Sequence, residues 1–435
     1  MRVAAVLMSV VLAGCPAQAP TPTVSRHIAA LAAPGFAFVH QFTDAEGAAP
    51  RGHLVELGGR LYGLAGEGGP NAVAACQSTA SWDLDAHARQ CPGSLFSVAL
   101  GGDDFRVDHA FSQLDSALRN DDGYHPYGSP AIGPDGRLWG VTQAGGHSPG
   151  CVATAAGSGV LWVFDPRSST FSVEHQFCSV AGAADGKSPM GQVAFFGGEV
   201  FGTAKGAIAA GDSQIVWRWS AGAFAYTPSL TSYGWSDYGG LAATSSALVG
   251  MTNAGGANGR GAYFSVDPST LAVTKLWDFP SFTPSAYGRD NPAIQVPIVI
   301  SNGAIVAARE FGGAAGTGIV VDLSAQRVLQ ELDEVPFTAT PRFANTTGGM
   351  ANGTLAEGSD GLLYGATMYG GSAGVGVIYR IARDGSLFEV VHNFEAGGPS
   401  RPYGGLTLAS DGAFYGLAYS GKAIFRFVPP ARSCN

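Results

Sequence analysis

The sequence has few charged residues and no cluster of basic ones. Asp, Glu, Lys and Arg make up 13% of the 435 residues, and the net charge is −9. Without a basic patch, we expect no nucleic-acid partner. Long amphipathic helices are not visible after the N-terminus, whereas 64 glycines and 25 prolines indicate many short strands joined by tight turns.

Long hydrophobic runs are also lacking. An apolar stretch from Val3 to Val11 is too short to span a bilayer. Arg2 precedes this stretch, and Leu12-Ala13-Gly14-Cys15, which follows it, resembles a bacterial lipobox in which the cysteine is lipidated. An ordinary secretory signal cleaved near residues 17–19 is the alternative. Both interpretations predict export: a lipid-anchored protein of the bacterial cell envelope in the first case, a secreted one in the second.

The six cysteines form no C-x-x-C pair, so neither a zinc ribbon nor a thioredoxin-like site is supported. Export permits disulfides. Cys76 and Cys91 flank one insertion, and Cys151 and Cys178 are expected on one face of one unit. We therefore predict the bridges Cys76–Cys91 and Cys151–Cys178, with Cys434 unpaired within the chain.

A repeat fixes the expected architecture. Seven strand-like runs end in an apolar or aromatic residue followed by a small one, and Gly-rich turns follow. The small residues are Gly63, Gly140, Gly202, Gly250, Ala307, Gly365 and Gly416, at intervals of 48 to 77 residues. Such spacing is typical of propeller blades. The sequence predicts an all-β, seven-bladed β-propeller over residues 36–430, preceded by a signal peptide (1–15) and a Pro/Thr/Ala-rich tether (16–35) and followed by a tail (431–435).

The two ends of the repeat are offset in a way that predicts ring closure. After the seventh glycine the chain forms one more strand, Ala423 to Val428, and lacks an outer strand with the His-x-Phe pattern. That pattern occurs instead at the start, in Phe36 to Phe42. We expect the N-terminal strand to complete the last blade, which removes exposed strand edges.

The units also resemble the GloVer tandem-repeat family of exported bacterial proteins. The matching residues include Asp135-Gly136-Arg137-Leu138-Trp139-Gly140, Asp360-Gly361-Leu362-Leu363-Tyr364-Gly365 and Gly376-Val377-Ile378-Tyr379. This resemblance implies a β-propeller on an exported protein. It transfers no catalytic residue to this chain.

Candidate binding residues lie in the links that enter the inner strands. These links share an acidic-Gly-x-x-Pro-x-Gly pattern, and they present Arg51 and His53 as departures from it. Aromatic rings and arginines around a central funnel would suit a glycan, through stacking and contacts to carboxylates. The ligand-binding candidates are Tyr124, His125, Tyr127, Trp235, Tyr238, Arg289, Arg401 and Tyr403.

Two recurrent features have a structural and a functional interpretation. The acidic residues Glu46, Asp122 and Asp185 either ring the funnel and hold Ca²⁺ or a sugar, or they set the turns, which recurrence favours. Histidines recur on the outer strands at His40, His109, His175 and His392, which favours packing over metal binding.

The sequence thus favours a surface binding or interaction module whose partner is a glycan or an envelope protein. It predicts no cofactor and no metal, with Ca²⁺ as the exception to test, and only the lipid anchor would touch the membrane. A carbohydrate-active enzyme such as a polysaccharide lyase is the alternative, with Arg neutralising a uronate and His or Tyr moving the proton. A purely structural protein is third.

Overall fold

A computed structural model describes residues 34–72, 91–113, 115, 119–147, 158–180, 185–206, 214–228, 230, 239–281, 296–313, 316–332 and 347–431. These residues form strands and turns, with no helix among them. Within this part of the chain, no helix is long and apolar enough to cross a membrane.

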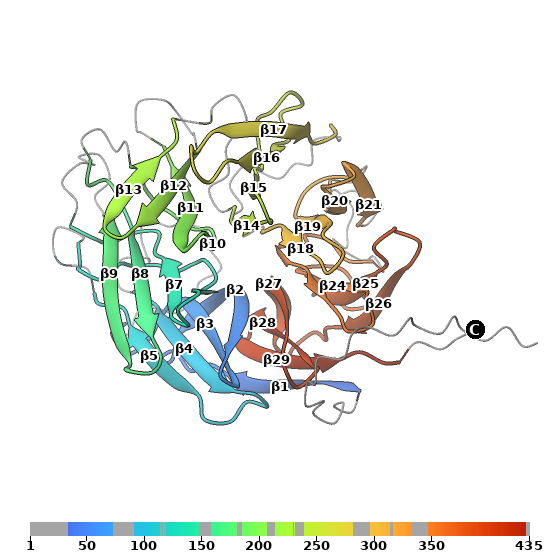
Figure 1. Cartoon of the computed structure of the whole chain (residues 1–435). Coiled ribbons are helices and arrows are strands. Elements are labelled where there is room, and N and C mark those ends of the chain that lie inside the picture. The colour runs from blue at the N-terminus through green and yellow to red at the C-terminus, as the bar shows by residue number, and fades with distance from the viewer. Residues whose placement is uncertain are drawn as a thin grey trace, which may run out of the picture.

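Seven antiparallel sheets stand around a central axis, as Figure 1 shows. Each sheet is a blade of four strands, and apolar clusters fill the spaces between neighbouring blades. This confirms the predicted seven-bladed β-propeller. From the axis outward, blade 1 has β2 (Ala48–Leu57), β3 (Arg60–Glu67), β4 (Ser94–Ala99) and β5 (Arg106–Ala110); blade 2 has β6 (Ala131–Ile132), β7 (Leu138–Val141), β8 (Val160–Asp165) and β9 (Thr170–Gln176); blade 3 has β10 (Ala194–Phe196), β11 (Glu199–Lys205), β12 (Gln214–Ser220) and β13 (Ala223–Tyr226). Blade 4 has β14 (Leu241–Ala243), β15 (Leu248–Met251), β16 (Ala262–Val266) and β17 (Val273–Asp278); blade 5 has β18 (Ile298–Val299), β19 (Ile305–Arg309), β20 (Ile319–Asp322) and β21 (Arg327–Glu331); blade 6 has β23 (Ala356–Glu357), β24 (Leu363–Thr367), β25 (Val377–Ile381) and β26 (Phe388–Asn393).

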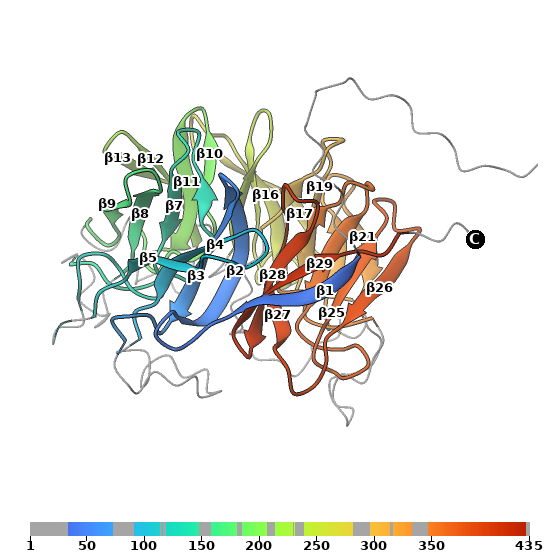
Figure 2. The ribbon, with the colours of Figure 1, turned by 90° about the horizontal axis from the view of Figure 1, so that it is seen from below.

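The seventh blade is built from both ends of the domain. It contains β27 (Ser400–Leu408), β28 (Phe414–Ser420), β29 (Ala423–Val428) and, as its outer strand, β1 (Gly35–Gln41). β1 pairs antiparallel with β29, from Gly35 opposite Val428 to Gln41 opposite Ala423. Figure 2 shows the N-terminal strand lying against β29 at the rim. The predicted closure by the N-terminal strand is confirmed.

The repeat glycine has a steric cause. It does not end the second strand, as the sequence pattern suggested, because β3 and β11 continue beyond it to Glu67 and Lys205. Each repeat glycine lies opposite a large ring of the third strand, and a Cβ would overlap that ring. The approaches are 2.5 Å for Gly63 to Phe96, 2.3 Å for Gly140 to Trp162, 2.2 Å for Gly202 to Trp217, 2.6 Å for Gly250 to Phe264, 2.3 Å for Gly365 to Tyr379 and 2.4 Å for Gly416 to Phe425. The exception supports this explanation, since Ala307 lies opposite Val321, which has no ring.

One face of the ring carries the links from each outer strand to the next inner strand, together with the turns between second and third strands. We call it the link face; its described links are residues 42–47, 111–113, 119–130, 177–180, 185–193 and 394–399. Just inside this face the inner strands touch one another through backbone. A Cβ on Gly52 would lie 2.5 Å from Gly128 O, and one on Gly404 would lie 1.8 Å from Gly52 O. A short strand, β22 (Gly353–Thr354), also pairs in parallel with β27.

Candidate functional site

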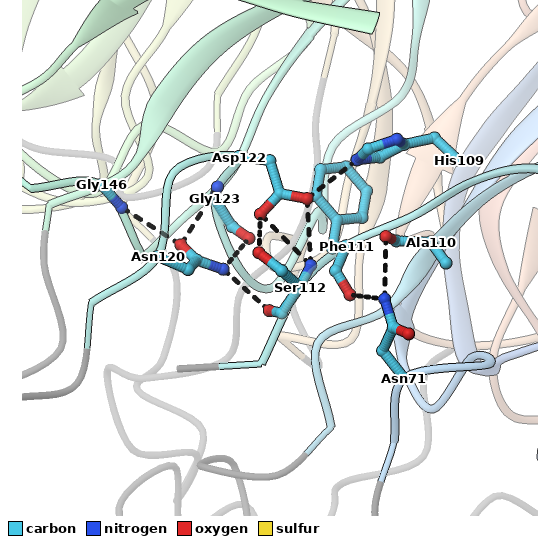
Figure 3. Close-up of polar contacts among 9 residues, drawn as sticks. All are labelled: Asn71, His109, Ala110, Phe111, Ser112, Asn120, Asp122, Gly123 and Gly146. Atoms are coloured by element: carbon cyan, nitrogen blue, oxygen red, sulfur yellow. Dashed lines mark hydrogen bonds and ion pairs between the residues drawn. The ribbon is translucent and has the colours of Figure 1, made fainter. Parts of the chain in front are cut away.

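The acidic residues of the links bind the outer strands rather than facing the axis. Asp122 accepts a hydrogen bond from the Ser112 amide at 3.0 Å and lies 3.0 Å from Nε2 of His109. Asn120 completes the link through the carbonyls of Ser112 and Gly123, as Figure 3 shows. Asp185 repeats the pattern in the next link. The interpretation of these residues as turn-setting groups is supported.

Calcium binding gains no contact from this arrangement. In the described part of the chain, no three His, Cys, Asp or Glu side chains lie close enough to share a metal ion. Several link carboxylates already accept hydrogen bonds, and the Ser179 amide and hydroxyl lower the pKa of Asp185 together with His175, against the opposing effect of burial. Calcium therefore stays a prediction.

The entry to each inner strand has a common backbone. The residue three positions before the axial glycine has a positive φ in every blade where it is described. These residues are Ala49 (48°), His125 (54°), Ser188 (48°), Met350 (60°) and Arg401 (55°). Since alanine and serine adopt the same conformation as His125 and Arg401, the left-handed backbone belongs to the repeat and is not a strain specific to one site.

Two residues further on, the side chains form a buried ring around the axis. It consists of Arg51, Tyr127, Met190, Asn352 and Tyr403, which are 6%, 2%, 2%, 1% and 1% exposed. The guanidinium carbon of Arg51 lies 4.3 Å from the Tyr127 ring centroid and 5.8 Å from that of Tyr403. Burial acts to lower the pKa of Arg51, but the surrounding tyrosines and Glu67 raise it above its ordinary value. Cation–π contacts thus stabilise this buried charge.

Three predicted binding residues lie together beside Arg51, but they are buried. Tyr124 and His125 are 2% and 4% exposed. Tyr124 accepts a hydrogen bond from the Cys91 amide at 3.0 Å, and His125 stacks on Tyr127 with ring centroids 4.9 Å apart. Burial, with a smaller contribution from Arg51, lowers the pKa of His125 to about 3, so its ring is neutral. In the described structure these rings pack within the protein.

Arg401 is the predicted residue with a partly exposed side chain. Its guanidinium carbon lies 5.2 Å from the ring centroid of Tyr369. Tyr369 and Tyr419 are also partly exposed, and both pack against a buried cluster of Met350, Met368 and Tyr403. We call Arg401, Tyr369 and Tyr419 the tyrosine–arginine patch. Burial raises the pKa of Tyr369, and the nearby Arg401 opposes that rise.

Sequence reasoning missed Tyr369 and Tyr419 because they end second strands instead of lying in links. Their signal was an aromatic residue three or four positions after the repeat glycine, visible when the units are aligned on Gly365 and Gly416. Other predicted residues lie outside the described part of the chain: Trp235, Tyr238, Arg289, Cys15, Cys76, Cys151 and Cys434. Their proposed partners Cys91 and Cys178 are buried, and the bridges stay predictions.

His53 lies at the axis and joins four blades. Its backbone amide donates to Ser129 Oγ at 2.8 Å, and its Nδ1 lies 3.0 Å from that oxygen and 3.3 Å from Thr354 Oγ1. Its Nε2 lies 3.2 Å from the amide nitrogen of Gln192, which also donates to Pro130 O. An amide nitrogen has only donors, so Nε2 accepts and the ring proton sits on Nδ1. Burial lowers the pKa of His53 to about 4.

Solved structures with similar folds are distant from this chain. TolB from Acinetobacter baumannii is 11% identical with a TM-score of 0.37, and the match covers 80% of this chain and 61% of TolB. A candidate 6-phosphogluconolactonase from Bacteroides uniformis is 11% identical with a TM-score of 0.44, covering 78% and 88%. At this level neither structure indicates a function for this chain. A search of curated proteins finds no significant match.

The sequence itself matches a known repeat family. The Gloeobacter/Verrucomicrobia repeat matches residues 79–321, more than half of the chain. This agrees with the resemblance carried by the repeat units and with the seven blades of the fold. The chain therefore belongs to the Gloeobacter/Verrucomicrobia repeat family.

Proposed function

We propose that this propeller is an exported, lipid-anchored binding module of the bacterial cell envelope that takes a glycan on its link face. The observation that carries the proposal is the tyrosine–arginine patch, where a partly exposed guanidinium lies 5.2 Å from an aromatic centroid. Tyrosine rings offer flat apolar surfaces on which a sugar can stack. An arginine can bind a carboxylate through two parallel hydrogen bonds, so an acidic glycan fits best.

Burial favours binding over catalysis. A polysaccharide lyase needs a base within hydrogen-bond reach of the sugar proton. His125 and Tyr127, the nearest histidine–tyrosine pair, are 4% and 2% exposed, and Tyr127 already donates to Glu67 at 3.2 Å. The exposed groups of the patch offer a cation and ring faces, which bind without moving a proton. Lyase activity remains the alternative that the experiment below separates.

A glycan array on the full-length protein, followed by calorimetry with the best acidic ligand, tests the proposal. Arg401→Ala should weaken binding about tenfold or more, the range of a lost charge-assisted contact, while the melting temperature changes little. The substitution is compatible with the backbone, because Ala49 occupies the equivalent position with φ 48°. Arg167→Ala is the control, since Arg167 is exposed and pairs with Asp165 away from the patch.

The outcomes are distinct. Equal affinity of the Arg401→Ala variant and the parent protein, or no glycan binding at all, would refute the proposed site. Release of unsaturated uronate products, followed by ultraviolet absorbance, would instead show a lyase. In that case Tyr127→Phe should abolish turnover, whereas a binding module should lose little from this buried substitution.

The anchor and the bridges belong to the same proposal. Metabolic labelling with a fatty acid should mark the parent protein and not Cys15→Ser. Peptide mapping without reduction should recover Cys76–Cys91 and Cys151–Cys178. Cys91 and Cys178 both lie on the link face and are 4% and 0% exposed, which supports a structural use. Recovery of either peptide with a free thiol would contradict that bridge.

A further inference from the structure

Arg309 is a buried cation in an apolar space between two blades. It ends β19 in blade 5, is 3% exposed, and its guanidinium carbon lies 3.7 Å from the ring centroid of Phe279, which follows blade 4. Nη2 donates to the Arg260 carbonyl at 2.8 Å. Nε is buried and has no acceptor within the described residues. A guanidinium has five N–H donors, so most of its capacity is unused.

The fold does not require a cation at this position. The equivalent residues in other blades are small: Ala65, Thr142, Ala204, Thr252, Thr367 and Ala418. Thr142 satisfies its hydroxyl locally, donating to Ala144 O at 3.0 Å and accepting from the Val160 amide at 3.1 Å. Arg309 therefore departs from the repeat without filling a role that the other blades need.

A buried charge without a counterion is unfavourable, because desolvation is not offset by attraction. Burial accordingly lowers the pKa of Arg309 to about 9. Stacking on Phe279 covers one flat side of the guanidinium and leaves its edge, including Nε, for acceptors in its plane. A planar carboxylate matches such an edge in shape and charge.

We propose that Arg309 anchors a binding site for a single carboxylate group at the boundary between blades 4 and 5. One carboxylate oxygen accepts the hydrogen bond from Nε, and the negative charge compensates the buried guanidinium. The ring of Phe279 holds the guanidinium plane in place. The carboxylate can come from a small acid or from a uronate sugar. This site is separate from the tyrosine–arginine patch and does not depend on the proposed glycan function.

Thermal unfolding of the full-length protein tests the site, with sodium acetate, sodium galacturonate and neutral galactose as probes against sodium chloride at equal ionic strength. The parent protein should melt about 2 °C or more higher in a binding carboxylate, since a ligand that binds only the folded state stabilises it. Arg309→Thr, which installs the residue of three other blades, should abolish that rise. Arg309→Met keeps the length and the contact with Phe279, and should abolish it too.

Two controls separate this site from other causes. Arg167→Thr and Arg401→Ala should both keep the rise, the second because the glycan patch is a different site. A rise with acetate and galacturonate indicates a site for a free carboxylate, and a rise with galacturonate alone indicates a uronate. No rise in the parent protein, or an equal rise in the Arg309→Met variant, would overturn the inference. Arg309→Met decides the question if Arg309→Thr fails to fold.

Discussion

His109 on the outer strand of blade 1 lies flat on Phe171 of blade 2, with ring centroids 3.7 Å apart and an interplanar angle of 3°. The same stack joins three further boundaries: His175 on Phe224 at 3.9 Å, His40 on Phe105 at 4.0 Å and His392 on Phe36 at 3.8 Å. Two of these pairs include a residue of β1. The recurrent histidines are therefore packing groups that connect neighbouring blades, as the sequence pattern favoured.

Removing one stack should lower stability without opening the fold. In a double-mutant cycle of His109→Ala and Phe171→Leu, we expect a coupling energy of roughly 0.5–1.5 kcal/mol, the value of an aromatic pair beyond its buried area. Urea unfolding measures it. Gln330→Ala is the matched control, because Gln330 holds the equivalent position in blade 5 and has no aromatic partner there among the described ring contacts. Additive effects of the two substitutions would show that the stack contributes nothing.

Stability should fall with pH through His53. Its pKa is about 4 in the folded protein against 6.5 ordinarily, so folding favours the neutral ring. The stabilisation is complete above pH 6.5 and is lost as the pH falls from 6.5 towards 4. We expect a loss of roughly 1–3 kcal/mol in unfolding free energy over that range.

The comparison with His53→Asn isolates this effect, since His125 and His392 titrate in both proteins. The difference in unfolding free energy between parent and variant should shrink as the pH falls through this range. Urea titrations at several pH values provide the measurement. A difference that stays constant with pH would show that the axial histidine is not the titrating group.

The closest backbone approach at the axis gives a sharper test of packing. Gly404→Ala places a Cβ 1.8 Å from Gly52 O, at a residue with φ +95°, so two blades must separate. We expect a loss of about 3 kcal/mol or more, in the range of severe overpacking and backbone effects. Gly398→Ala is the control, because a Cβ there meets nothing within 4 Å. Equal melting temperatures for the two variants would refute the close contact.

Removal of the closing strand should cost far more than removal of the tether. Deleting residues 16–43 removes β1 and leaves the edge of β29 unpaired. Deleting residues 16–33 is the matched control, since it keeps β1. The first deletion should lower the melting temperature by more than about 5 °C relative to the second. A difference of only about a degree would show that the ring does not depend on this strand.

The fold was predictable because its cause is repeated. Gly63 and its equivalents mark each second strand, and the His-x-Phe pattern of β1 and β26 shows which blade lacks an outer strand. The site was less predictable. Tyr127 and Tyr403 occupy the axial position expected from their links, but their burial depends on neighbouring blades, which no local pattern encodes. The four-blade contacts of His53 join residues up to 301 positions apart, and only the closed ring brings them together.

The seam between β1 and β29 also determines how the ring responds to force. Gly35 lies opposite Val428, so the chain enters and leaves the domain at the same point of the same blade. A pull on the residues before Gly35 loads the hydrogen bonds of this seam one after another, as a zipper is opened, instead of all at once. Under tension from an N-terminal attachment, the seventh blade would peel first and the other six would stay assembled until it had opened.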